Sequence, residues 1–71
     1  MPRKIRQLEA ELLAHGFVLL RGRGKGDHRR FEHPDHPDLA ITLDGQSGDD
    51  AKPYQEKQIR QAIAAIAERR A

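Results

Sequence analysis

The sequence predicts an α+β domain with the element order α-β-β-β-α, in which a three-stranded antiparallel sheet carries two helices on one face. Apolar residues recur at helical spacing over residues 3–14 and again from about residue 53. Between these two segments lie an apolar run at 17–20, a segment at 28–33 that carries Phe31, and an alternating segment at 39–43. The loops that join them are too short for parallel crossovers, so the strands are expected to form a meander. A sheet with one apolar face needs helices to cover that face.

The first helix is expected over residues 3–14. Its apolar positions are Ile5, Leu8, Leu12 and Leu13. Gly16 follows the last helical turn and His15 lies near its carbonyl end, and both are typical stop signals. The apolar run at 17–20 then predicts the first strand.

The middle of the chain predicts two more strands and the second helix. After a glycine-rich loop at 22–27, residues 28–33 are expected to form the second strand. The prolines and aspartates of 34–38 predict a turn, and residues 39–43 alternate as a third strand. A polar loop leads to Pro53, a residue well placed in the first turn of a helix. The apolar side of that second helix carries Tyr54, Ile59, Ile63 and Ile66. Tyr54 is expected in the core or in a contact at the helix start, against the alternative that its ring stacks on a base.

Strand periodicity assigns side chains to the two faces of the sheet. Phe31 is expected to point toward the helices, and Arg29 shares its face because successive residues alternate. The open face then receives His28, Arg30, Glu32, Ala40 and Thr42. It is therefore a polar surface on which a substrate strand could lie.

Length and composition limit the class of protein. The 71 residues are expected to form a single domain spanning 1–71, with a core small enough that a partner or oligomerisation would supplement it. No cysteine is present, which excludes disulfides and thiolate metal sites and fits a reducing compartment. No apolar run is long enough for a membrane span or a signal peptide, so we expect a cytoplasmic protein without membrane contact.

The segment 21–30 concentrates basic residues around three glycines, with Asp27 as its one acid. Glycine lets the backbone approach a ligand, cations bind phosphate, and His28 can move a proton near neutral pH. The segment therefore predicts a site for RNA chemistry, against the alternative of a solvated hairpin loop. No helix follows it, which excludes a dinucleotide-binding fingerprint or a P-loop.

Several motifs together resemble the HicA toxin family. They are the first amphipathic helix, Gly16-Phe-Val-Leu-Leu-Arg21, the Gly-x-His motif Gly26-Asp27-His28, the aromatic Phe31, and His33-Pro34 after it. The likeness runs over roughly residues 3–43. It implies a small bacterial mRNA interferase with a fold like that of double-stranded-RNA-binding domains, and a HicB-like antitoxin that masks the site. An oligomer within that toxin–antitoxin complex stays an open alternative.

The resemblance implies that His28 carries RNA cleavage as a single catalytic histidine. We expect its imidazole to act as general base on a ribose 2′-OH, without a metal or another cofactor. Lys25 and Arg30 are expected to stabilise charge on the phosphate. Arg23, Gly26 and Arg29 are expected to bind RNA phosphates.

Two alternatives to a ribonuclease remain open from the sequence. One is a non-catalytic RNA-binding module, which needs cations but no titrating base. The other is a degenerate toxin that only binds its antitoxin. A metal site at His33, Asp35, His36 and Asp38 is not expected, because these residues lack the spacing of zinc hydrolases and suit a turn.

Overall fold

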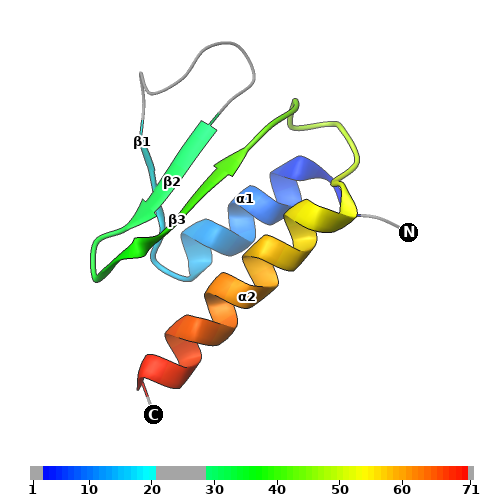
Figure 1. Ribbon diagram of the computed structural model, residues 1–71. Helices are drawn as coiled ribbons and strands as arrows, with labels where there is room; N and C mark the ends of the chain where they lie inside the picture. Colours follow the sequence, from blue (N-terminus) through cyan, green and yellow to red (C-terminus); the bar gives the residue numbers. More distant parts are fainter. Residues whose placement is uncertain (1–2, 21–28, 71) are drawn as a thin grey trace.

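The computed structural model describes residues 3–20 and 29–70, and it confirms the predicted fold class and element order (Figure 1). The elements are α1 (Ile5–Ala14), β1 (Val18–Leu20), β2 (Arg29–His33), β3 (His36–Leu43) and α2 (Pro53–Arg70). The three strands form one antiparallel sheet in the order β1-β2-β3. β3 is therefore an edge strand.

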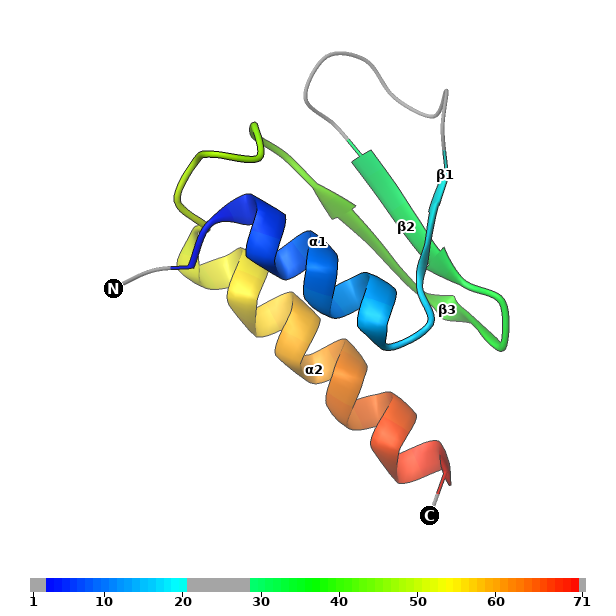
Figure 2. The same cartoon turned by 180° about the vertical axis from the view of Figure 1, so that it is seen from behind.

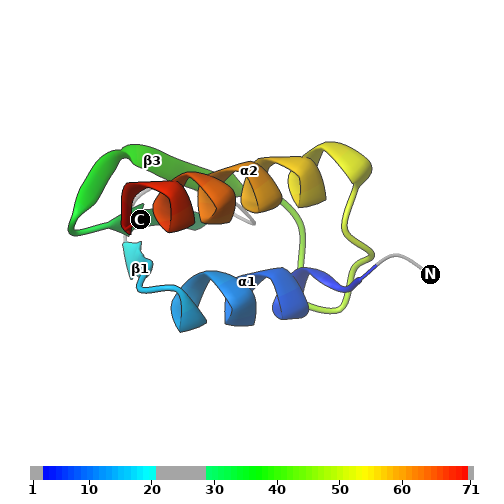
Figure 3. The same ribbon diagram turned by 90° about the horizontal axis from the view of Figure 1, so that it is seen from below.

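Both helices lie on one side of the sheet. The reverse view shows α1 and α2 together against it (Figure 2), and the view from below shows the two helices running alongside each other (Figure 3). Their apolar stripes and the inner face of the sheet meet in a single core. Its larger members are Ile5, Leu8, Leu12, Phe17, Phe31, Ile41, Leu43, Ile59 and Ile66. The prediction that Phe17 and Phe31 belong to the core is confirmed.

Strand register confirms the predicted faces for the residues described. Phe31 pairs with Ile41 across β2 and β3, and both are buried. The adjacent pair, Arg30 with Thr42, is exposed on the opposite face. The alternation therefore separates a core face from an open face one residue apart.

The predicted turn at 34–38 is too long. β3 already begins at His36, so that Pro34 and Asp35 alone connect it to β2. The ring of His33 closes this short connection because its Nδ1 accepts a hydrogen bond from the Asp35 N–H at 3.1 Å. Pro37 fits inside the strand because β3 lies at the edge of the sheet, where a missing N–H can be tolerated.

The same histidine fastens the turn to the end of α1. Since Nδ1 of His33 is an acceptor, Nε2 carries the proton and donates to the His15 carbonyl oxygen at 3.0 Å. The Phe17 ring meets the imidazole edge-on, with ring centroids 5.2 Å apart. Gly16 has φ +94°, and a Cβ there would lie 2.7 Å from His33 Nε2. Glycine is thus required both by the helix end and by the imidazole packed on it.

Gln55 organises the start of α2. Its side chain is buried, accepts from the Lys52 N–H at 2.8 Å and donates to the Asp44 carbonyl oxygen at 3.1 Å. Tyr54 is 48% exposed, so the expectation of a core position for it was wrong, and Gln55 takes the buried place instead. Neither described helix is both long and apolar enough to cross a membrane.

Candidate functional site

Two of the predicted site residues, Arg29 and Arg30, lie at the start of β2, where the structure describes them. Figure 1 shows this end of the strand beside the loop that follows β3. The other predicted site residues, Arg23, Lys25, Gly26 and His28, lie outside the described residues. His28 immediately precedes Arg29 in the chain. The geometry around Arg29 and Arg30 is therefore the part of the site that the structure supplies.

Arg29 is directed to the helix side of the sheet, as predicted. Its Nε lies 2.7 Å from Glu9 Oε2 of α1, in a direction that suits a charge contact more than a hydrogen bond. Its Nη2 donates to the Gly45 carbonyl oxygen at 2.7 Å. Both charged side chains are largely buried, with 24% of Arg29 and 17% of Glu9 exposed. Arg29 thus fixes the first residue of β2 to α1 and to the loop after β3.

That loop is itself held against α1. The Ile5 N–H donates to the Asp49 carbonyl oxygen at 2.9 Å, and the Arg6 N–H donates to the Ser47 carbonyl oxygen at 3.0 Å. These are N–H groups of the first helical turn, which have no partner within a helix. Gly45, at φ +102°, lies near the start of the loop, and its carbonyl oxygen accepts a hydrogen bond from Arg29. Through these hydrogen bonds, the loop between β3 and α2 holds the N-terminus of α1 and the start of β2 in place.

Arg30 has the opposite environment. It lies on the open face, where its Nε donates to Glu32 Oε2 at 2.9 Å. The two side chains are 44% and 40% exposed, so water can replace either partner. An exposed pair of this kind stabilises a fold by about 0.2–1 kcal/mol, which a phosphate contact can offset. Arg30 is available to a ligand, whereas the charge of Arg29 is already engaged inside the domain.

Histidines and aspartates around the β2–β3 turn are used in protein contacts. Both ring nitrogens of His33 have backbone partners, and His36 Nδ1 lies 3.1 Å from Arg69 Nη1. Arg69 also donates to both carboxylate oxygens of Asp38, at 3.0 and 2.7 Å, and holds the pKa of Asp38 at about 2. Within residues 3–20 and 29–70, no three side chains of His, Asp or Glu converge as metal ligands.

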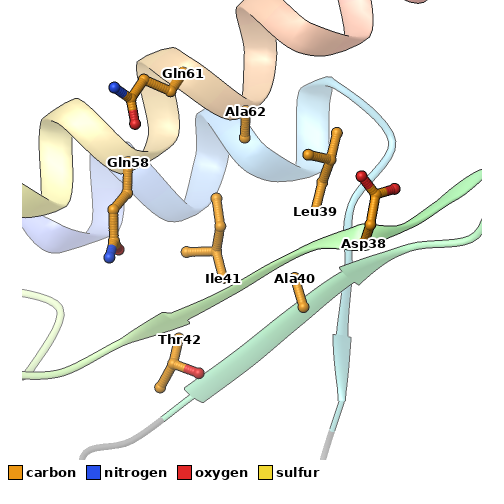
Figure 4. A pocket seen from close by; sticks show the side chains of 8 residues that line it. All are labelled: Asp38, Leu39, Ala40, Ile41, Thr42, Gln58, Gln61 and Ala62. Carbon is orange, nitrogen blue, oxygen red and sulfur yellow. The ribbon is translucent and has the colours of Figure 1, made fainter.

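A groove between β3 and α2 is a feature that the sequence analysis missed. It has a volume of about 450 Å³ and opens at the outer edge of the sheet (Figure 4). Gln58, Gln61 and Ala62 line it from the helix, and residues 38–42 line it from the strand. Gln58 and Gln61 are three residues apart, which places both on one side of α2. This spacing was the one feature of the sequence from which a polar helix face at the groove could have been predicted.

Comparison with known protein families decides the wider identity. A family model described as the HicA toxin of bacterial toxin–antitoxin systems matches residues 5–65. The chain belongs to the HicA toxin family. This confirms the resemblance drawn from the sequence, and the match extends beyond residue 43 into α2. Neither the curated proteins nor the solved structures gave a match to the chain.

Membership of the HicA toxin family gives the chain the role of a toxin and implies an antitoxin partner. On the open face of the sheet, exposed Arg30 lies opposite Thr42 in the register of β2 and β3, and Ala40 points to the same side as Thr42 (Figure 4). Arg29 anchors β2 from the opposite, helix-covered face of the sheet. The arrangement can present a cation at one end of the sheet while the backbone that carries it stays fixed.

Proposed function

We propose that this HicA-family chain is a cytoplasmic endoribonuclease toxin that cleaves mRNA without a metal ion. The observation that carries the proposal is the family match, because residues 5–65 include the Gly26-Asp27-His28 motif. The geometry at the start of β2 supports it. An anchored Arg29 follows His28 directly in sequence, and an exposed Arg30 comes next.

In the proposed reaction, the neutral imidazole of His28 removes the proton from a ribose 2′-OH. The resulting oxygen attacks the adjacent phosphorus, the new 2′-O–P bond forms, and the P–O5′ bond breaks. The products are a 2′,3′-cyclic phosphate and a 5′-OH, whose proton comes from the imidazolium or from water. With one histidine to serve both proton transfers, we expect a slow enzyme.

Cations stabilise the negative charge that builds on the phosphate oxygens. We assign this role to Arg30 and Lys25, and we assign binding of the flanking phosphates to Arg23 and to the backbone of Gly26. For Arg29, the contact with Glu9 supports an anchoring role more directly than phosphate binding. To bind a phosphate, Arg30 exchanges its contact with Glu32 for the ligand.

The test replaces His28 with alanine and compares it with His15→Ala. His15 is a matched control, because its side chain is exposed and the structure uses its backbone carbonyl. Loss of a general base reduces a rate by about 10²–10⁴-fold, so we expect His28→Ala to abolish detectable cleavage of mRNA. His15→Ala should cleave at the rate of the parent chain. Circular dichroism would establish that both variants fold.

Two substrate controls separate the proposed chemistry from its alternatives. Cleavage should continue in EDTA, and RNA with a 2′-deoxyribose at the cut position should resist cleavage because its nucleophile is missing. A folded His28→Ala chain that cuts as fast as the parent would refute the role of His28. A parent chain that binds RNA and never cuts it would instead identify a binding module.

A further inference from the structure

The outer edge of β3 is a surface that the ribonuclease proposal does not use. β3 pairs with β2 on one side, and among the described residues no strand pairs with its other side. An edge strand exposes N–H and C=O groups that can pair with another chain, and proteins protect such edges with proline and charge. Here Pro37 and the ion pair of Asp38 with Arg69 protect the beginning of the strand. Residues 39–43 carry neither device.

The groove lies along this less protected part of β3. Its strand side covers residues 38–42, a length of about 17 Å for five extended residues. Figure 4 looks onto the edge, with Leu39 and Ile41 pointing toward α2 and with Ala40 and Thr42 pointing away from it. An edge strand beside a helix, with a groove between them, is the arrangement in which peptides bind by strand addition.

The chemistry of the groove favours a polypeptide over RNA. Among the described residues, Asp38 is its one charged lining residue, and neither lysine nor arginine lines it. A nucleic-acid backbone needs cations to neutralise its phosphates. Gln58 and Gln61 instead offer amide donors and acceptors, which match the backbone and polar side chains of a peptide.

We propose that an extended segment of the antitoxin adds to β3 as a fourth antiparallel or parallel strand, in the groove against α2. The inference rests on membership of the toxin–antitoxin family and does not depend on catalysis by His28. The bound segment carries small or apolar side chains toward α2, where Ile41 and Ala62 line the groove.

The other side of the added strand extends the open face. Thr42 lies opposite Arg30 in the register of β2 and β3, so a strand beside Thr42 is two strand spacings, about 10 Å, from Arg30. An acidic side chain on that strand can reach the Arg30 guanidinium and compete with Glu32. Charge complementarity with Arg30 favours an acidic residue at the position of the segment that faces it.

Amide hydrogen exchange tests the proposal residue by residue. The chain is purified alone and in complex with its HicB-like antitoxin, and exchange is measured for β3. Strand addition protects those amides of residues 38–42 whose N–H groups do not pair with β2, because a strand in the middle of a sheet pairs with a neighbour on each side. We expect at least tenfold slower exchange at these outward amides in the complex.

A pair of matched variants tests the helix side of the groove. Gln58→Arg with Gln61→Arg places two long side chains across it, and Ala64→Arg with Ala67→Arg adds the same two charges at exposed positions elsewhere on α2. We expect the first variant to raise the antitoxin Kd at least tenfold and the second to change it less than twofold. Equal effects of the two variants would overturn the proposal.

Three other results would also overturn it. Edge amides that exchange equally in the free chain and in the complex exclude strand addition. Protection that rises with the concentration of the free chain, together with a dimer in sedimentation, assigns the edge to a second copy. Protection by an RNA oligonucleotide alone assigns it to RNA. Cleavage of mRNA by the free chain is measured separately, so failure of the ribonuclease proposal leaves this test unchanged.

Discussion

Arg29 and Arg30 are adjacent in β2, yet they lie on opposite faces of the sheet and have opposite environments. Arg29 is largely buried and contacts Glu9 and the Gly45 carbonyl. Arg30 is exposed and contacts Glu32 alone among the pairs described. The difference comes from the two-residue period of a strand, which separates a residue that holds the fold from one that can meet a ligand.

The contrast extends to the two faces as a whole. On the helix side, buried polar groups such as His33 and Gln55 are hydrogen-bonded to backbone atoms of other elements. On the open face, the described polar contact is an exposed ion pair. We therefore expect substitutions on the helix side to change the free energy of unfolding, and substitutions on the open face to change RNA binding.

The largest effect is expected from Arg29→Ala. It removes a hydrogen bond to Gly45 and leaves Glu9 largely buried without its cation. Hydrogen bonds that involve a charged group contribute about 1.5–3 kcal/mol, so we expect a loss of about 2–3 kcal/mol in the free energy of unfolding. Urea denaturation measures it.

Arg30→Ala is the matched control for stability. It removes an exposed ion pair and should cost less than about 1 kcal/mol. If the two variants lost the same free energy, the distinction between an anchoring and an available arginine would be wrong.

The next effect tests the contact between the end of α1 and His33. Gly16→Ala forces an alanine to φ +94° and places its Cβ against His33 Nε2. A left-handed backbone conformation costs about 1–2 kcal/mol for a residue with a side chain, and displacement of the imidazole adds to this. We expect a lower thermal unfolding midpoint.

Gly48→Ala is the comparison for Gly16→Ala. A Cβ at Gly48 meets nothing within 4 Å, and its φ lies outside the left-handed region. Alanine there should leave stability unchanged or raise it by about 0.4–1 kcal/mol, because the unfolded chain loses freedom. A Gly16→Ala chain as stable as Gly48→Ala would show that His33 does not require the glycine.

A smaller effect concerns RNA binding by the open face. If Arg30 contacts a phosphate, Arg30→Ala lowers the affinity for RNA about five- to tenfold. It also reduces the slope of the logarithm of the RNA association constant against the logarithm of the salt concentration by about 0.7, which is the value for one phosphate contact with a single strand. Arg6→Ala removes the same charge from an exposed position on α1 and is the control. An unchanged slope in Arg30→Ala, measured by fluorescence anisotropy over a salt series, would remove Arg30 from the site.

The sequence was sufficient to predict the layers of the fold because the signals are local. Helical spacing, strand alternation and Pro53 each act within a few residues, and together they predicted all five elements and the faces of Arg29 and Arg30. The turn was predicted too long because a side chain closes it. Nδ1 of His33 accepts the hydrogen bond of the Asp35 N–H, in the place of the backbone carbonyl that closes an ordinary turn. Composition favoured an irregular segment there, and this contact allowed β3 to start earlier.

The candidate site was less accessible to sequence reasoning. The partner of Arg29 is Glu9, twenty residues away and on another element, so no local pattern reveals it. The groove exists because α2 lies beside the edge of β3, and a spatial relation between two elements is not encoded in either one alone. The roles of His28, Lys25, Arg23 and Gly26 stay predictions, since these residues lie outside the described part of the chain.

The smallest effect is expected at the rim of the groove, where Arg69 donates hydrogen bonds to Asp38 and holds its pKa at about 2, below the usual 3.8. Because the folded-state pKa is lowered, the pair stabilises the fold above about pH 4, and this contribution is lost as the pH falls from about 4 to about 2. Both side chains are exposed, so the contribution is small and is screened by salt. Thermal unfolding of the parent chain and of Asp38→Asn between pH 6 and pH 2 should show two curves that converge at the acid end. Arg69→Gln should converge in the same way, whereas a constant difference between parent and Asp38→Asn across this range would mean that the ion pair contributes nothing to stability.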